Sequence, residues 1–170
     1  MSKINAGVMS SASDEWSTPT DLFSVLDREF GFGLDAAATA DNAKCRRFFS
    51  PADDGLAQDW TRERAPIWLN PPYSRIVDWM HKAHESARAG AFVVCLVPAR
   101  TDTRWFWRYA VPGVVRFLPG RLKFGNGRKS APFPSAVVIL PPGLFVGGVV
   151  HFWDWRFGDW RQGKGKGQCV

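Results

Sequence analysis

Residues 67–97 read IWLNPPYSRIVDWMHKAHESARAGAFVVCLV, and this stretch decides the fold. Its first three residues are an apolar run typical of a buried strand, and the two prolines end the strand because proline donates no ladder hydrogen bond. Apolar residues then recur at helical spacing over 75–89. Residues 91–97 are a continuous apolar run, as in a strand covered on both faces. Strand, helix and strand in this order predict parallel pairing in an α/β sheet.

The same patterns predict the other elements outward from this unit. We expect helices over residues 21–30 and 102–109, strands over 32–38, 114–118, 135–140 and 149–156, a possible strand at 46–49, and a hairpin that brings 122–124 back after the turn at 119–120. Together they predict a mostly parallel central sheet with an antiparallel C-terminal strand or hairpin. We expect one domain over residues 14–160, between a disordered segment at 1–13 and a basic flexible tail at 161–170.

The net charge of +6 is divided unevenly along the 170 residues. Residues 1–90 hold 10 Lys and Arg against 13 Asp and Glu, a net −3, whereas residues 91–170 hold 12 against 3, a net +9. A basic half favours a polyanionic partner such as nucleic acid, and the alternative is a basic protein without one. No apolar run approaches the ~20 residues of a membrane span, so no membrane contact is expected.

The three cysteines, Cys45, Cys95 and Cys169, are too few and too widely spaced for a disulfide framework or a CxxC metal pattern. They fit a reducing cytoplasm. His81 and His84 lie three residues apart on a predicted helix, but no further ligand completes a known metal spacing. We therefore expect no metal site.

The tetrad Asn70-Pro71-Pro72-Tyr73 follows a predicted strand, where ligands collect in open α/β sheets. The Asn70 oxygen can accept one N–H of an amino group and the Pro71 carbonyl the other, while the prolines stiffen the loop. Tyr73 offers a flat face for stacking on a planar group. The tetrad thus suits a planar group that bears an NH₂. The alternative is a Pro-Pro turn with a capping asparagine.

The motifs of residues 14–142 resemble, in order, those of the phage-type DNA N6-adenine methyltransferases, a small Dam-like family. The matching pieces are WSTP at 16–19, LDAAA at 34–38, DDGL at 53–56, QDW at 58–60, WLNPPY at 68–73, PARTDT at 98–103, WF at 105–106, PGRLKF at 119–124 and PSAVV at 134–138. The resemblance implies a Rossmann-like S-adenosylmethionine methyltransferase fold and methyl transfer to the N6 amine of adenine in double-stranded DNA. It further implies base flipping, protection of phage DNA from host restriction, and a monomer or weak homodimer in the bacterial cytoplasm.

By this resemblance, Asn70, Pro71, Pro72 and Tyr73 form the catalytic site. The S-adenosylmethionine cofactor would contact residues on both sides of the first strand and before the tetrad: Thr18 and Pro19 at its amino-acid end, Asp35 at its ammonium, Ala36 in the following turn, Asp54 or its neighbour Asp53 at its ribose, and Asp59 and Trp60 at its adenine. Most such enzymes have a Gly-rich turn after the first strand, whereas this sequence has Ala36-Ala37-Ala38-Thr39.

We expect DNA contacts from basic side chains that begin at residue 100 and belong to recognition loops inserted after it. The candidates are Arg100, Arg104, Arg121, Lys123, Asn126, Arg128 and Lys129, with Arg108 and Arg116 as further basic residues of the same half. Two alternatives remain open at this point. The same tetrad can serve methylation of RNA or of a protein glutamine, and the chain can be a non-catalytic nucleic-acid-binding module.

Overall fold

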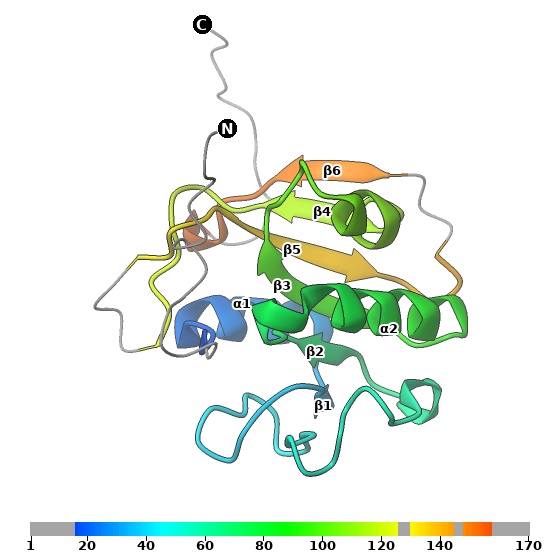
Figure 1. Ribbon diagram of the computed structural model, residues 1–170. Coiled ribbons are helices and arrows are strands. Elements are labelled where there is room, and N and C mark those ends of the chain that lie inside the picture. Colours follow the sequence, from blue (N-terminus) through cyan, green and yellow to red (C-terminus); the bar gives the residue numbers. More distant parts are fainter. Residues whose placement is uncertain (1–15, 126–129, 145–147, 158–170) are drawn as a thin grey trace, which may run out of the picture.

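The computed structural model describes residues 16–125, 130–144 and 148–157, and these form a mixed α/β fold around one sheet (Figure 1). The strands run in the order β1-β2-β3-β5-β4-β6, and helices α1 and α2 cover opposite faces. The elements in chain order are α1 (Thr20–Phe30), β1 (Leu34–Asp35), η2 (Trp60–Arg62), β2 (Ile67–Leu69), η3 (Tyr73–Arg75), α2 (Ile76–Arg88), β3 (Val93–Pro98), η4 (Phe106–Ala110), β4 (Val114–Phe117), β5 (Ser135–Leu140), β6 (Val149–Phe152) and η5 (Trp155–Phe157).

The sheet is mostly parallel, as predicted. Strand β1 pairs with β2 and β2 with β3 in parallel, and β4 pairs with β6 in parallel. Strand β5 lies between β3 and β4 and is antiparallel to both. The antiparallel strand expected near the C-terminus is therefore β5, whereas β6, the last strand described, runs parallel to its neighbour.

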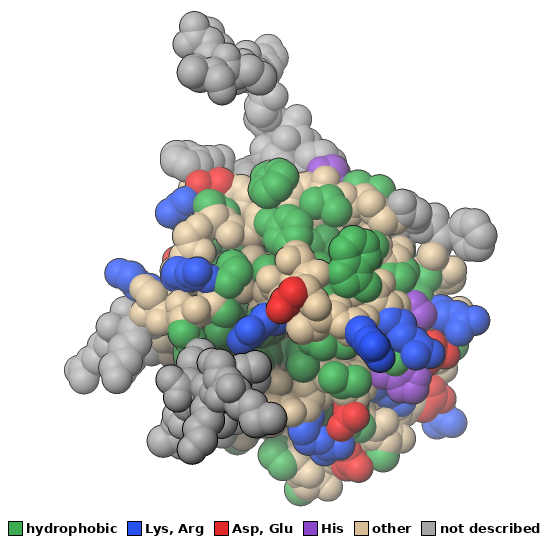
Figure 2. Space-filling view, turned by 45° about the horizontal axis from the view of Figure 1, so that its top comes forward, with side chains coloured by type: hydrophobic (Ala, Val, Ile, Leu, Met, Phe, Trp, Pro, Cys, Tyr) green, Lys and Arg blue, Asp and Glu red, His purple; other side chains and the backbone are tan. Residues whose placement is uncertain are grey.

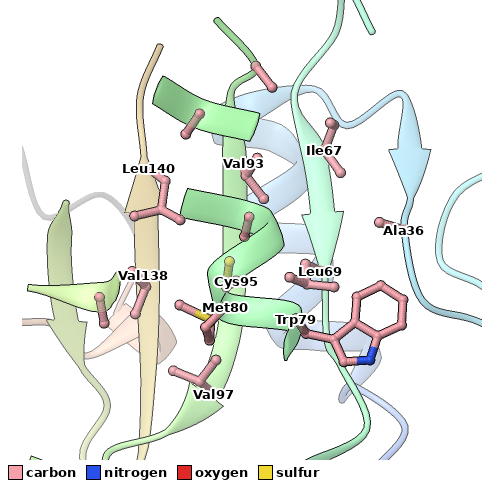
Figure 3. Close-up of a cluster of buried hydrophobic side chains, with 14 of the residues drawn as sticks. Ala36, Ile67, Leu69, Trp79, Met80, Val93, Cys95, Val97, Val138 and Leu140 are labelled. Atoms are coloured by element: carbon pink, nitrogen blue, oxygen red, sulfur yellow. The ribbon is translucent and has the colours of Figure 1, made fainter. Parts of the chain in front are cut away.

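Two hydrophobic cores form because alternate residues of each strand face opposite sides of the sheet. Val93, Cys95 and Val97 of β3 face α2, and Val94 and Leu96 face α1. Figure 3 shows the first core, in which Trp79 and Met80 of α2 lie over residues of β2, β3 and β5. In the second core, Leu22 and Leu26 of α1 are completely buried.

Several elements differ from the sequence-based expectation. The strand predicted over 32–38 is only Leu34–Asp35, and the possible strand at 46–49 is a single bridge between Phe48 and Asp35. Residues 106–110 of the predicted helix form a π-helix. The predicted hairpin between β4 and residues 122–124 is wrong, because β4 pairs with β5 and β6 whereas Lys123 bridges to Ser130. Residues 153–156, predicted to continue the last strand, lie beyond the end of β6.

The segments expected to be disordered or flexible, 1–13 and 161–170, lie outside the described residues. Within the described ranges, no helix is both long and apolar enough to cross a membrane.

A buried ion pair joins α1 to the sheet. Arg116 of β4 donates two hydrogen bonds of 2.7 Å to the two carboxylate oxygens of Glu29. The Arg116 guanidinium also lies 5.6 Å from the ring centre of Phe30 and 5.1 Å from that of Trp153. Such bidentate and cation–π contacts suit arginine, and they leave Arg116 only 5% exposed. Arg116 was expected among the basic residues available to DNA, and its burial against Glu29 shows that this expectation is wrong.

Removing the Glu29 charge should destabilise the fold, because the buried Arg116 guanidinium then loses the carboxylate that offsets the cost of its burial. We expect Glu29→Gln to lower the free energy of unfolding by about 2–3 kcal/mol, measured by urea unfolding. The control is Arg62→Ala, which breaks the exposed pair between Arg62 and Asp59 and should cost less than about 1 kcal/mol. Equal losses in the two variants would contradict the role of burial.

Candidate active site

A cavity of about 280 Å³ opens where β1 and β2 end, at the edge of the sheet at which the sequence predicted a site. Its volume is near the lower end of the ~300–1,000 Å³ typical of ligand pockets. The lining residues come from the segment before α1, the carboxyl ends of β1 and β2, the loop between them and the start of α2: Trp16, Ser17, Thr18, Asp35, Ala37, Ala38, Thr39, Asn42, Lys44, Phe49, Ser50, Pro51, Asp54, Gly55, Trp68, Asn70, Pro71, Pro72, Arg75 and Trp79.

The carboxamide of Asn70 is held at both ends. Its nitrogen Nδ2 donates to the backbone carbonyl of Trp16 and to Oγ1 of Thr18, the latter over 3.0 Å. Its oxygen Oδ1 accepts a hydrogen bond of 3.1 Å from the hydroxyl of Tyr73. A carbonyl oxygen has two lone pairs, so Oδ1 can accept one more N–H. Asn70 therefore presents an oriented acceptor at the cavity.

Tyr73 lies behind Asn70 and does not line the cavity. Its ring is 7% exposed and makes edge contacts with Phe133 and Phe124, at centroid distances of 5.5 and 6.5 Å. Pro71 and Pro72, by contrast, are part of the lining. The structure thus brings all four residues of the tetrad to one place, with the tyrosine the most deeply packed against aromatic neighbours.

Asp35 is a buried carboxylate in the cavity wall, with 2% of its surface exposed. The backbone N–H of Lys44 donates to it over 3.0 Å and that of Ala37 over 3.4 Å. Burial raises the pKa of Asp35, and these two N–H groups and the nearby Lys44 charge offset only part of that rise. A cation bound in the cavity would stabilise the ionised form of Asp35.

The backbone conformation of the turn after β1 explains why alanines can stand where a Gly-rich turn was expected. Among the described residues other than glycine, only Asp54 and Leu144 have a positive φ, so residues 36–39 need no left-handed backbone. Glycine is needed instead at Gly55, where an added Cβ would lie 2.4 Å from the Ala36 carbonyl oxygen. The residue that comes close to the backbone after β1 is thus Gly55, and glycine is not required within residues 36–39 themselves.

The predicted cofactor contacts divide into two groups. Thr18, Asp35 and Asp54 line the cavity, whereas Pro19, Ala36, Asp59 and Trp60 do not. Asp59 caps η2 by accepting from the backbone N–H of Thr61. Trp60 is completely buried, and its indole N–H donates to the Gly55 carbonyl over 2.9 Å. Trp60 therefore supports the cavity wall through Gly55, whereas Asp59 is an exposed cap of η2.

Sequence reasoning missed Trp79 and Arg75, which reach the cavity from the start of α2. Trp79 was assigned no role. It lies on the apolar face of the predicted helix, where the sequence pattern does not distinguish a residue that reaches the cavity from one that only packs in the core. Its indole extends past the end of β2 toward Ala36 (Figure 3). The indole nitrogens of Trp79 and Trp68 are buried and have no hydrogen-bond partner within the described residues.

The residues predicted to contact DNA differ in their solvent exposure. Arg104, Arg121 and Lys123 are exposed, and Arg100 is partly buried. Asn126, Arg128 and Lys129 lie outside the described residues. On the face shown in Figure 2, Lys and Arg side chains are scattered among hydrophobic ones and form no single continuous patch. Among the residues that the structure covers, no group of three or more His, Cys, Asp or Glu side chains could hold a metal ion.

A six-stranded mixed sheet with a ligand-sized cavity at the ends of its parallel strands defines an α/β domain with one candidate ligand site, whose wall holds an asparagine amide and a buried carboxylate. The chain belongs to the DNA N-6-adenine-methyltransferase (Dam) family, whose sequence model matches residues 5–137.

Two phage relatives are similar to parts of the chain. The DNA N-6-adenine-methyltransferase of Escherichia phage T1 is 37% identical over 94 residues, which cover 55% of this chain and 39% of the relative. That of Haemophilus phage HP1 is 32% identical over 96 residues, which cover 55% of this chain and 54% of the relative. The matched region thus spans about half or less of these relatives.

The raised pKa of Asp35 gives a pH signature. Since the folded-state pKa lies above the unfolded one, the folded protein holds more protons between the two values, and its stability falls as pH rises through that window. The Asp35→Asn variant has no titrating carboxyl at this position, so it lacks this pH-dependent loss of stability. We expect the free energy of unfolding of the variant, relative to the wild type, to increase from pH 3.5 to pH 7, as measured by urea unfolding at each pH.

The control for this prediction is Asp53→Asn. Hydrogen bonds from the Ser50 side chain and backbone hold the pKa of Asp53 below its ordinary value, so the sign reverses. Relative to the wild type, the stability of this variant should decrease from pH 3.5 to pH 7. The same direction of change in both variants would show that burial does not govern Asp35.

Proposed function

We propose that this chain transfers a methyl group from S-adenosylmethionine to the N6 amine of adenine in double-stranded DNA, on a Rossmann-like methyltransferase fold. The observation that carries the proposal is the oriented amide of Asn70 at a cavity that also holds the buried carboxylate of Asp35. Membership of the Dam family and the names of the two phage relatives support the same reaction.

The residues of the cavity fit the cofactor. S-adenosylmethionine carries an ammonium and a sulfonium, and Asp35 is a buried carboxylate in the cavity wall that accepts from two backbone N–H groups of the described residues. Its ribose hydroxyls can be met by the exposed Asp54, and its carboxylate by Lys44, both of which line the cavity. When bound, the cofactor supplies an electrophilic methyl group.

The chain's own part in the reaction is to hold the target amine. Asn70 Oδ1 would accept one of its N–H groups, and the Pro71 carbonyl, on a loop stiffened by two successive prolines, would accept the other. Drawing both protons toward acceptors turns the nitrogen lone pair out of conjugation with the ring and toward the methyl group. Tyr73 keeps Oδ1 in place by donating its hydroxyl hydrogen bond to it.

The proposed partner is DNA with the target adenine flipped out of the helix. Arg104, Arg121 and Lys123 are exposed and can contact phosphates, together with Arg100 and with Asn126, Arg128 and Lys129 of the following loop. Lys123 bridges to Ser130 and the Ala131 N–H donates to the Leu122 carbonyl, so the segments 122–125 and 130–133, called the hairpin below, are paired. In a phage the reaction would protect DNA from restriction in the host cytoplasm.

Loss of the Asn70 amide should abolish methyl transfer. We expect DNA from cells that express the wild type to contain N6-methyladenine, and Asn70→Ala to lower the rate by about 100-fold or more because a preorganised acceptor is lost. Modification-sensitive sequencing measures the modified base and its sequence context together. Methylation by Asn70→Ala at the wild-type level, or modified RNA in place of DNA, would contradict the proposal.

Cofactor binding should depend on Asp35. S-adenosylhomocysteine at about 100 times its dissociation constant should stabilise the wild type by about 2.7 kcal/mol, seen as a higher unfolding temperature. Asp35→Asn should lose most of this shift because the ammonium loses its counterion, whereas Asn70→Ala should keep it. A full shift in Asp35→Asn would place the ammonium elsewhere.

A further inference from the structure

We infer that Thr18 is a positioning residue whose hydroxyl, together with the Trp16 carbonyl, sets the orientation of the catalytic amide of Asn70. This inference rests on the proposed function and deepens it by naming a residue that acts on the reaction through Asn70. Thr18 is 4% exposed and lies 52 residues away from Asn70 along the chain.

The contacts give the amide one favoured orientation. An amide is nearly symmetric in shape, so only its hydrogen-bond partners distinguish the oxygen from the nitrogen. At the Nδ2 end, Asn70 meets a carbonyl and a hydroxyl oxygen, and at the Oδ1 end it meets the Tyr73 hydroxyl. Rotating the amide by 180° would set Oδ1 against the Trp16 carbonyl oxygen. The N-terminal segment therefore keeps the acceptor end directed to the substrate.

The segment that carries Thr18 is itself fixed by the hairpin of residues 122–125 and 130–133. The Trp16 ring makes edge contacts with Phe124 and Phe133, each at a centroid distance of 5.3 Å. The backbone N–H of Gly125 donates to the Ser17 carbonyl over 2.9 Å. Residues 16–18 thus lie between the hairpin and the catalytic amide.

The same hairpin contacts the other catalytic side chain. Phe133 and Phe124 pack against the ring of Tyr73, which in turn donates to Asn70. Each end of the Asn70 amide is therefore hydrogen-bonded to a member of one aromatic cluster. The cluster consists of Trp16, Tyr73, Phe124 and Phe133. Contacts made by the hairpin that we propose to recognise DNA therefore help to fix the orientation of the Asn70 amide.

A positioning role and a cofactor contact at Thr18 predict different kinetics. If the hydroxyl only orients Asn70, its loss lowers kcat and leaves ligand binding unchanged. If it binds the cofactor, its loss weakens the affinity for S-adenosylhomocysteine. Thr18→Val is the sharpest variant because valine has the shape of threonine without the hydroxyl, and Thr18→Ser is its matched partner because serine keeps the oxygen.

We expect Thr18→Val to lower kcat by roughly tenfold or more, since a small misplacement of a reacting group is costly. The dissociation constant for S-adenosylhomocysteine and the KM for DNA should stay within about twofold of the wild type. Thr18→Ser should recover most of the rate. Ser24→Ala, which removes an exposed hydroxyl of α1, is the control for a general effect of losing a hydroxyl.

Three results would overturn the inference: unchanged kcat in Thr18→Val, a loss of S-adenosylhomocysteine affinity as large as the loss of rate, or Thr18→Ser as slow as Thr18→Val. Should Thr18→Val fail to fold, Thr18→Ala replaces it in the comparison with Thr18→Ser, since both shorten the side chain and only serine keeps the hydroxyl.

A measurement without substrate separates this inference from the proposed function. The chain has four asparagines, Asn5, Asn42, Asn70 and Asn126. In protein labelled with ¹⁵N-asparagine, the Asn70 side-chain signal is the one absent from Asn70→Ala. It should shift in Thr18→Val and stay in place in Thr18→Ser. An unshifted signal in Thr18→Val overturns the inference, whereas a wild type that methylates no adenine overturns the proposed function alone.

Discussion

Complete burial of β2 between two helices is the constraint on which the rest of the structure depends. Ile67, Trp68 and Leu69 are all 0% exposed, and the strand pairs in parallel with β1 on one side and β3 on the other. Parallel strands end at the same edge of a sheet, so burial of three apolar residues brings the end of β1 beside the residue that follows β2. Asp35 and Asn70 share a cavity for this reason. The prolines then prevent the strand from continuing into the site.

The site is held together by contacts between parts of the chain that are far apart. Asn70 is bonded to Trp16 and Thr18, which lie 54 and 52 residues before it, and its neighbour Tyr73 packs on Phe133. The loop from residue 37 to 55 supplies much of the remaining wall. Such an arrangement preorganises the acceptor, because each partner is itself fixed by packing. The uneven charge along the chain follows the same division of parts. Asp35 and Asn70 of the site lie in the acidic half, residues 1–90, whereas the exposed Arg104 lies in the basic half, residues 91–170.

Regular elements were the most predictable part of the fold. The strands at 67–69 and 135–140 have the predicted bounds, and both α-helices agree within one residue at each end, because apolar periodicity is a local property. The irregular stretch between β1 and β2 was less predictable. Asp54 and Asp59 have the same local signature there, an aspartate in a polar loop, yet one lines the cavity and the other caps η2. Only the path of the loop distinguishes them.

The sequence by itself determined the α/β class, the family and the tetrad at the end of a buried strand, because these depend on apolar periodicity, on the order of motifs and on proline's missing donor. The tertiary structure decided which aspartates reach the cavity, that Arg116 is buried against Glu29, and which way the Asn70 amide faces. Those properties depend on partners tens of residues away. A local pattern specifies the side chain at a position, whereas only the fold brings it the atoms with which it bonds.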